Sequence, residues 1–187
     1  MKVTREQAVQ NRDTVVDAAS RLFRLHGVDG IGIGEIMRES GLTHGGFYGQ
    51  FASKDALAGE ACARALEGSV ARWTRIVEEN PGDPVSALAT DYLSARNRDT
   101  PETGCALVAL AADAARRGEV GTAFRAGLLR LAEIVEQAVP DQGREESLAI
   151  VSQMVGAMVL ARAVGDPDIS DAILAATRKA LCTAEQP

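Results

Sequence analysis

The clearest chemical signal lies within residues 33–50, where two short helices joined by a glycine turn match the helix-turn-helix pattern. In the turn, Gly41 permits a positive φ, Leu42 fills the corner, and Thr43 caps the second helix. Phe47 and Phe51 are expected to anchor that helix to the core. The positions left facing outward are Thr43, His44, Gly45, Gly46, Tyr48 and Gln50.

Two of these outward positions, Gly45 and Gly46, are glycines, and each costs a helix about 1 kcal/mol against alanine. A short exposed helix that carries both glycines suggests a surface that approaches another molecule closely. A poorly formed helix or a loop is the alternative interpretation.

The other residues with chemical potential give little support to catalysis. The chain has two histidines, His26 and His44, and neither lies in a GxSxG, HExxH or phosphate-loop motif. Its three cysteines, Cys62, Cys105 and Cys182, are far apart and include no CxxC pair. We therefore expect no enzyme, no metal site, no cofactor and no disulfide scaffold.

Cys105 is the one candidate for a redox or electrophile sensor. It follows Gly104 at an expected helix start, where the helix dipole favours a thiolate. The alternative is a small buried hydrophobic side chain, which is the usual role of a free cysteine. Because a reactive thiol needs exposure and cationic neighbours, the sequence favours the structural role.

The elements that position these residues are expected to be helices throughout. Apolar residues recur at helical spacing, helix-forming residues fill the segments between prolines, and no run alternates with period two. Start and stop signals predict nine helices, at 11–26, 33–40, 44–50, 54–80, 84–97, 104–116, 119–138, 144–164 and 168–183. Gly27 is expected to cap the first, and Ser53 and the pair Asp83-Pro84 to begin the fourth and fifth. The predicted fold class is all-α.

The segment from Gly41 to Leu57 resembles the DNA-binding signature of the TetR family of bacterial regulators. The shared pattern is a glycine–hydrophobic–Ser/Thr turn, a short helix ending in an aromatic–Tyr pair, and a Phe-x-Ser-Lys-acidic-x-Leu start to the next helix. Upstream, Ala19, Leu22, Phe23, Gly27 and Ile36 also fit the family. The chain departs from the pattern at Ile31 and Gly32, where the family often has Thr or Ser, so a weaker cap on the second helix is expected.

The resemblance implies a three-helix DNA-binding domain at residues 1–55 and a ligand-binding and dimerisation domain at residues 56–187. It assigns phosphate contacts to Thr43, Tyr48 and Lys54, and positions facing base edges in the major groove to His44, Gly45 and Gly46. Gln50 is assigned to either a phosphate or a base. We interpret Lys2, Arg5 and Arg12 as solvated surface charge, with contacts to the DNA backbone as the alternative.

For the second domain the resemblance implies a ligand pocket. Suitable lining residues, each of which taken alone is ordinary core, are Trp73, Tyr92, Leu107, Leu110, Phe124, Leu128, Met154 and Met158. Because few charged residues fall on this lining, the expected inducer is apolar or aromatic. We interpret Arg96, Arg98 and Arg125 as solvated side chains, with pairing to an anionic ligand as the alternative.

The last two predicted helices carry apolar stripes that suit a homodimer interface. One stripe is Leu148, Val151, Val155, Met158 and Val159, and the other is Ile173, Ala176, Thr177, Ala180 and Leu181. Small residues at Gly156, Ala157 and Ala161 permit close helix approach. The resemblance implies a four-helix bundle between two copies; packing of the same stripes within one chain is the alternative.

Composition narrows the class of protein. With 187 residues, 46% apolar and 25% charged, the chain is globular, and its lack of a long apolar run or signal core predicts a cytoplasmic protein without a membrane partner. The net charge of −6 argues against a protein that coats polyanions, whereas residues 1–55 hold seven basic and seven acidic side chains. The expected function is a sequence-specific transcriptional repressor that binds double-stranded operator DNA and is released by a small apolar or aromatic ligand. The alternative is a thiol-based redox or electrophile sensor that uses Cys105.

Overall fold

The structure, a computed structural model, describes residues 4–139 and 143–183. Within these ranges the chain is all-α, as predicted, and has no strand. In chain order the elements are α1 (Arg5–His26), α2 (Ile33–Glu39), the 3-10 turn η1 (His44–Gly46), α3 (Lys54–Glu79), α4 (Pro84–Tyr92), α5 (Ala95–Asp99), α6 (Ala106–Ala109), α7 (Ala111–Ala114), α8 (Gly118–Ala138), α9 (Gly143–Ala163) and α10 (Pro167–Thr183).

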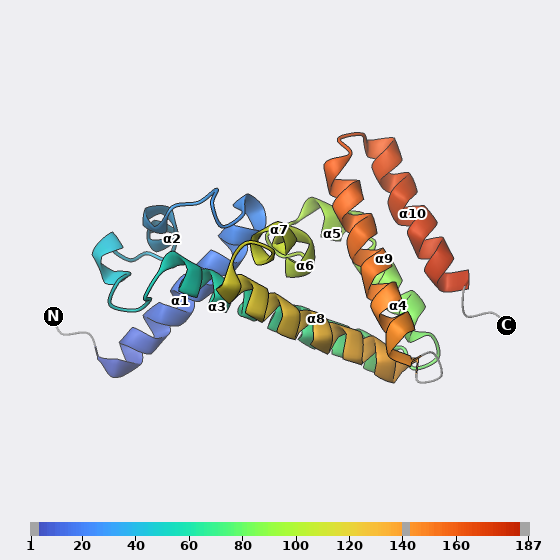
Figure 1. The fold of residues 1–187 in the computed structure, drawn as a ribbon, viewed down its shortest axis with the longest axis horizontal. Helices are drawn as coiled ribbons and strands as arrows, with labels where there is room; N and C mark the ends of the chain where they lie inside the picture. Colours follow the sequence, from blue (N-terminus) through green and yellow to red (C-terminus); the bar gives the residue numbers. More distant parts are fainter. Residues whose placement is uncertain (1–3, 140–142, 184–187) are drawn as a thin grey trace.

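Helices α3 and α8 lie side by side, run in the same direction and form the long axis of the molecule (Figure 1). Two glycines permit their close approach. A Cβ on Gly127 of α8 would lie 2.5 Å from Cδ1 of Leu66, and one on Gly59 of α3 would lie 3.1 Å from the carbonyl oxygen of Glu119. The two helices therefore pack almost backbone to backbone at these points.

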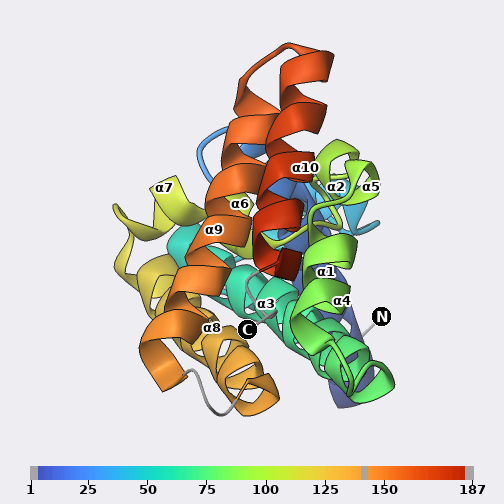
Figure 2. The ribbon, with the colours of Figure 1, turned by 90° about the vertical axis from the view of Figure 1, so that its right-hand side faces the viewer.

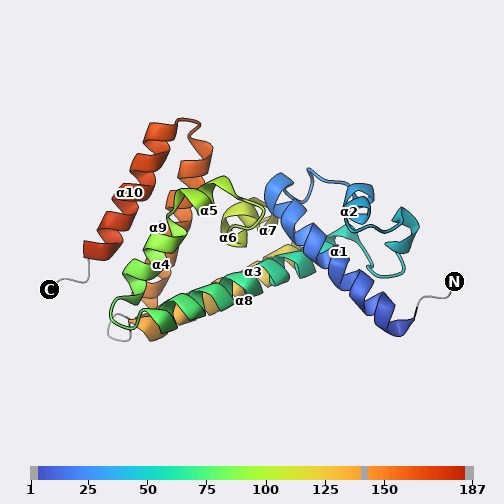
Figure 3. The same cartoon turned by 180° about the vertical axis from the view of Figure 1, so that it is seen from behind.

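The other helices gather at the two ends of this axis. At the N-terminal end of α3, helix α1 crosses it and α2 packs beside α1, as the view from behind shows (Figure 3). The turn η1 packs in turn against α2. At the far end, α9 and α10 form a hairpin, and α10 packs against both α9 and α4 (Figure 2). The short helices α5, α6 and α7 lie between the two groups.

Three predicted helix ends are confirmed. Gly27 ends α1 with a φ of +72°. The Ser53 hydroxyl accepts a hydrogen bond from the Ala56 amide at 3.0 Å, and the Asp83 carboxylate accepts one from the Ser86 amide at 3.1 Å with Pro84 in the first turn. These side chains satisfy amides that a helix start leaves without a partner.

Other predicted boundaries are wrong for identifiable reasons. Helix α1 begins at Arg5, six residues earlier than expected, because the Thr4 hydroxyl caps it by accepting from the Gln7 amide at 3.1 Å. The helix predicted at 84–97 is two helices, because Ser94 begins a second one by accepting from the Asn97 amide at 3.3 Å. The helix predicted at 104–116 is likewise divided into α6 and α7 around Leu110.

The helix predicted at 44–50 is reduced to a single 3-10 turn, His44–Gly46, followed by turn residues. Three of the seven residues in this stretch are glycines, which lower helix stability through their backbone entropy. The predicted Thr43 cap is also wrong, because Thr43 precedes η1 but its side chain makes no capping hydrogen bond.

Candidate DNA-binding surface and cavity

The turn between α2 and η1 has the predicted geometry. Gly41 has a φ of +70°, and the Leu42 amide donates to the Met37 carbonyl oxygen at 2.9 Å, which closes the end of α2. At the other end of α2, where Gly32 has no side chain to cap the helix, the Glu35 carboxylate accepts from the Gly32 amide at 3.0 Å. The expected weak cap is therefore compensated one turn later.

The residues that follow the turn lie on a rigid aromatic base. Phe47 and Phe51 are buried, and their rings stack at 5.5 Å between centroids. Tyr48 meets the edge of Phe47 at 5.1 Å but leaves 68% of its own surface exposed. Since Tyr48 is held at its base and free at its hydroxyl, it presents a fixed polar tip to solvent.

Six residues are expected to face outward. The structure exposes five of them: Thr43, His44, Gly45, Gly46 and Tyr48. His44 lies beside Tyr48, with 6.3 Å between ring centroids. Gln50 is half-buried instead, because its amide nitrogen turns back and donates to the Gly46 carbonyl oxygen at 3.3 Å. Its amide oxygen is buried without a hydrogen-bond partner.

The two central glycines are not required by packing within the chain. A Cβ on Gly45 would meet nothing within 4 Å, and one on Gly46 would lie 3.7 Å from Cε of Met37, an ordinary contact. Neither glycine has a positive φ. The small size of these positions therefore has no explanation inside the described protein.

Basic residues border this surface. Lys54 is the first residue of α3, is partly exposed, and has no carboxylate within ion-pair distance among the described residues. Arg12 is paired with Glu60 at 2.6 Å and lies over the Phe51 ring, 4.7 Å from its centroid, so it is partly packed and not simply solvated. Arg5 is exposed on α1, and Lys2 lies outside the described residues.

A cluster around Arg117 joins this N-terminal unit to the C-terminal helices. The Arg117 guanidinium pairs with Asp29, in the loop after α1, and with Asp55, in the first turn of α3. Its hydrogen bond to Asp29 lowers the pKa of that carboxyl. Buried Asp113 lies 3.6 Å from Arg117 and accepts from the Val28 amide at 3.4 Å.

A cavity of about 390 Å³ lies between α1, α3, α4 and the loop before α6. Trp73 and Tyr92 meet edge to face on its wall, with 5.7 Å between their centroids. Four arginines and two aspartates also line it: Arg21, Arg24, Arg64, Arg72, Asp17 and Asp91. The expected apolar lining therefore needs correction, because charged side chains from α1 and α3 face the cavity alongside the aromatic pair.

The structure brings two of the eight predicted lining residues, Trp73 and Tyr92, to this cavity. The other six pack in the core between α6, α8 and α9 and their neighbours. Four are fully buried, Leu107, Leu110, Met154 and Met158, and two are half-buried, Phe124 and Leu128. Helical spacing identified them as inward-facing but gave no information on whether space lies in front of them.

Cys105 is the third predicted residue on the cavity wall. It is 5% exposed and precedes the four-residue α6. The neighbouring Gly104 carbonyl oxygen accepts from the Arg24 guanidinium at 2.7 Å, so cationic charge is close. Cys62 is fully buried in the core, and burial raises its pKa to about 12. Cys182 is half-buried near the end of α10.

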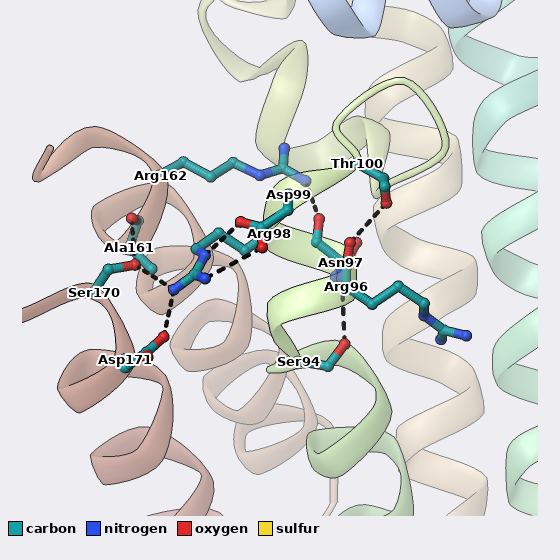
Figure 4. Close-up of polar contacts among 10 residues, drawn as sticks. All are labelled: Ser94, Arg96, Asn97, Arg98, Asp99, Thr100, Ala161, Arg162, Ser170 and Asp171. Carbon is teal, nitrogen blue, oxygen red and sulfur yellow. Dashed lines mark hydrogen bonds and ion pairs between the residues drawn. The ribbon is translucent and has the colours of Figure 1, made fainter. Parts of the chain in front are cut away.

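Polar contacts fix α5 against the C-terminal hairpin (Figure 4). Arg98 donates to Ser170 at 3.0 Å and to Asp171 at 2.5 Å, both on α10, and its side chain is only 18% exposed. The solvated role expected for Arg98 is therefore wrong. Arg162 of α9 donates to the Asn97 carbonyl oxygen at 2.6 Å. Arg96 pairs with Asp91 at 2.9 Å and stays largely exposed.

The hairpin of α9 and α10 carries an exposed apolar face. Its large exposed members are Val159, Leu160, Val164 and Ile169. By contrast, Val151, Met158 and Leu181 from the predicted stripes are buried within the chain. Helix α9 is long and apolar enough to cross a membrane by composition, but core helices pass the same test, so this evidence is weak. No group of metal-binding side chains occurs among the residues that the structure describes.

The exposed helix-turn-helix unit and the larger helical unit that follows it are together typical of a DNA-binding protein with a second, all-helical domain. The model of bacterial regulatory proteins of the tetR family matches residues 15–61. Over 85 residues the chain is 32% identical to the HTH-type transcriptional regulator AcrR of Shigella flexneri, and over 83 residues 35% identical to the A-factor receptor protein of Streptomyces griseus. These matches cover 46% and 44% of this chain but only 40% and 27% of the two relatives.

The similarity in fold extends over nearly the whole chain. A TetR transcriptional regulator from Chloroflexus aurantiacus superposes with a TM-score of 0.80 at 24% identity, covering 97% of this chain and 98% of that one. Residues 15–61 are thus similar to the tetR family of bacterial regulatory proteins, and the fold of the chain is that of a solved TetR transcriptional regulator.

Proposed function

We propose that this protein is a transcriptional regulator that binds specific DNA sites with residues 43–50. The observation that carries the proposal is the exposed strip of Thr43, His44, Gly45, Gly46 and Tyr48 on its buried aromatic base. Thr43, Tyr48 and Lys54 contact phosphates, while His44 donates to a purine edge in the major groove. The glycines let the backbone approach the bases. Gln50, which is turned back on its own loop, acts by holding that loop or reaches DNA after rotating outward.

The regulator acts as a homodimer, since one helix-turn-helix unit makes few DNA contacts. The exposed apolar face of α9 and α10, with Val159, Leu160, Val164 and Ile169, supports pairing through these helices. Two recognition segments related by a two-fold axis would meet successive major grooves roughly 34–36 Å apart, or somewhat farther. The DNA site is therefore expected to be an approximate palindrome.

We also propose that a small molecule in the cavity controls DNA binding, with repression as the default. Helix α3 connects the two regions, because Lys54 and Trp73 lie 19 residues apart on it, or about 28 Å. A ligand releases the DNA only if it binds one conformation more tightly than the other. A relative whose name describes it as an A-factor receptor supports a ligand-responsive role. We retain residues 1–55 and 56–187 as the DNA-binding and ligand-binding domains.

Selection from a random pool of double-stranded DNA tests the DNA-binding proposal. The purified protein should enrich one approximately palindromic sequence, and its binding should weaken steeply with salt as phosphate contacts require. Enrichment of no sequence above background would refute the proposal. A variant with Tyr48→Ala and Lys54→Ala should lose the enrichment without a change in helical content.

A second candidate function is thiol sensing through Cys105, which the structure favours in two respects: the residue lines the cavity, and the guanidinium of Arg24 lies beside it. Treatment with N-ethylmaleimide should release DNA from the parent protein, and Cys105→Ser should bind DNA normally but not respond. An equal response in Cys105→Ser would return Cys105 to a structural role, and Cys182→Ser serves as the matched control.

A further inference from the structure

One cation on the cavity wall, Arg24, forms no ion pair within the described part of the chain. Arg24 of α1 donates to the Ser20 carbonyl oxygen at 2.9 Å and to the Gly104 carbonyl oxygen at 2.7 Å, both of them neutral. No carboxylate of the described chain lies within ion-pair distance of it, although burial lowers its pKa. The other three arginines on the wall, Arg21, Arg64 and Arg72, are each paired with a carboxylate.

A second guanidinium reinforces this charge from behind the wall. Arg162 of α9 donates to the Asn97 carbonyl oxygen, as Figure 4 shows, and its Nε is buried without a partner. It pairs with no carboxylate in the described part of the chain, and burial lowers its pKa as well. A Cβ on Gly104 would lie only 2.6 Å from its Nη2. Arg24 and Arg162 thus both lie beside Gly104, and neither has a carboxylate within ion-pair distance in the described chain, although Glu102 acts on both through its charge.

The Tyr92 hydroxyl is a second buried group in this region without a hydrogen-bond partner. Tyr92 is 3% exposed, and its oxygen has no hydrogen bond of normal geometry although the Cys105 thiol is adjacent. Burial raises its pKa well above the ordinary value, so the hydroxyl keeps its proton and remains a donor. A buried polar group without a partner costs about 1–3 kcal/mol. A ligand that supplies an acceptor would recover that cost.

We propose that the cavity binds a small carboxylate with an aromatic or apolar body, the carboxylate lying between Arg24 and the Tyr92 hydroxyl and the body against Trp73. Arg24 and the protonated Tyr92 hydroxyl both present donors to the cavity, so an acceptor on the ligand suits them. A monoanion is favoured over a phosphate dianion because Asp17 and Asp91 also face the cavity. The volume of about 390 Å³ is within the range of small-molecule sites.

The consequence for DNA binding rests on the proposed function. A carboxylate at this position competes with the Gly104 carbonyl oxygen for Arg24, which is a contact between α1 and the loop before α6. Loss of that contact removes one of the restraints that hold the C-terminal end of α1 against the helices that follow it. Helix α1 packs against α2, and α2 packs against η1. A movement of α1 therefore changes the position of residues 43–50, the proposed recognition segment.

The test uses the full chain without DNA and three matched probe pairs: benzoate and benzamide, phenylacetate and phenylacetamide, and indole-3-acetate and indole-3-acetamide. We expect at least one carboxylate at millimolar concentration to raise the melting temperature, while its amide does not. For benzoate and phenylacetate, whose rings do not mask indole emission, the fluorescence of Trp73, the only tryptophan, should change as well. Phenyl phosphate, tested alongside, should bind more weakly than the carboxylates.

Two variants and one control locate the site. Tyr92→Phe removes only the hydroxyl and should lower the affinity for the carboxylate several-fold. Arg24→Gln should lower that affinity at least about tenfold. Arg75→Gln, an equal charge change at an exposed position on α3, should leave affinity unchanged. The proposal is overturned if no carboxylate binds, if the amides or phenyl phosphate bind equally well, or if both variants retain parental affinity. Because these measurements contain no DNA, none of these outcomes bears on the DNA-binding proposal, which the selection from random DNA tests separately.

Discussion

Replacing Gly45 and Gly46 by alanine should raise stability and lower DNA affinity at the same time. Both positions have negative φ, and the added Cβ atoms meet either nothing within 4 Å or only Cε of Met37 at 3.7 Å. The substitutions therefore cause no strain in the isolated protein. Each reduces the entropy of the unfolded chain and is expected to stabilise by about 0.4–1 kcal/mol.

The double variant should thus gain about 1–2 kcal/mol in the free energy of unfolding, which corresponds to a rise of roughly 2–8 °C in melting temperature. If the backbone at these positions lies against base edges, the two methyl groups hold the recognition segment away from the groove. Affinity for the selected DNA site should then fall at least about tenfold, a loss of about 1.4 kcal/mol. Calorimetry and fluorescence anisotropy with labelled DNA measure the two effects independently.

Gly68→Ala is the matched control, because Gly68 lies within α3 and a Cβ there would meet nothing within 4 Å. It should stabilise by about 1 kcal/mol and leave DNA affinity unchanged. Parental DNA affinity in the double variant would refute the assignment of Gly45 and Gly46 to close DNA contact. A fall in melting temperature would show instead that these glycines serve the fold.

Three further substitutions test the DNA contacts and the connection between the domains. Lys54→Ala should weaken binding to all sequences alike and reduce the slope of log affinity against log salt by about one unit, as a titration over salt concentrations measures. His44→Ala should reduce the free-energy difference between the preferred base and the other bases at one or two base pairs by roughly 1–3 kcal/mol, which a repeat of the random-pool selection would measure. Arg117→Gln should lower the melting temperature at neutral pH, whereas exposed Arg116→Gln should not. Because Arg117 lowers the pKa of Asp29, that stabilisation is present above pH about 4 and disappears as the pH falls through the lowered pKa; a parent–variant difference that persists in acid would contradict it.

The sequence predicted the parts of the fold that depend on local rules. Gly27, Gly41, Ser53 and Asp83 act at helix ends through their own backbone freedom or side-chain oxygens, so short sequence windows contain the needed information. The same rules missed the start of α1, although Thr4 and Gln7 three residues later form a recognisable capping pattern.

The cavity could not be predicted in the same way, because it depends on how helices distant in the sequence meet. Arg24 and Gly104 are 80 residues apart, and nothing in either local sequence indicates that one donates to the other. Helical periodicity gave Met154 and Leu107 the same inward-facing status as Trp73 and Tyr92. The distinction between a packed residue and a cavity wall depends on the space left in front of each side chain, which periodicity does not record.

The position of the cavity explains how a small ligand could control a distant surface. Two sets of contacts hold the end of α1 to the C-terminal helices: Arg24 on the Gly104 carbonyl, and the cluster of Arg117 and Asp113 on Asp29 and Val28. Only the first set touches the cavity, so a bound carboxylate removes one restraint and leaves the other as a pivot. A ligand needs about 5.5 kcal/mol of differential binding to reverse a two-state equilibrium from 1:99 to 99:1. A charge-assisted hydrogen bond to Arg24 contributes about 1.5–3 kcal/mol, less what is lost at the Gly104 carbonyl oxygen, and a newly satisfied Tyr92 hydroxyl contributes about 1–3 kcal/mol. The two contacts therefore approach the required amount only when both form. The regulator should therefore respond to molecules that engage Arg24 and Tyr92 simultaneously and ignore those that reach only one.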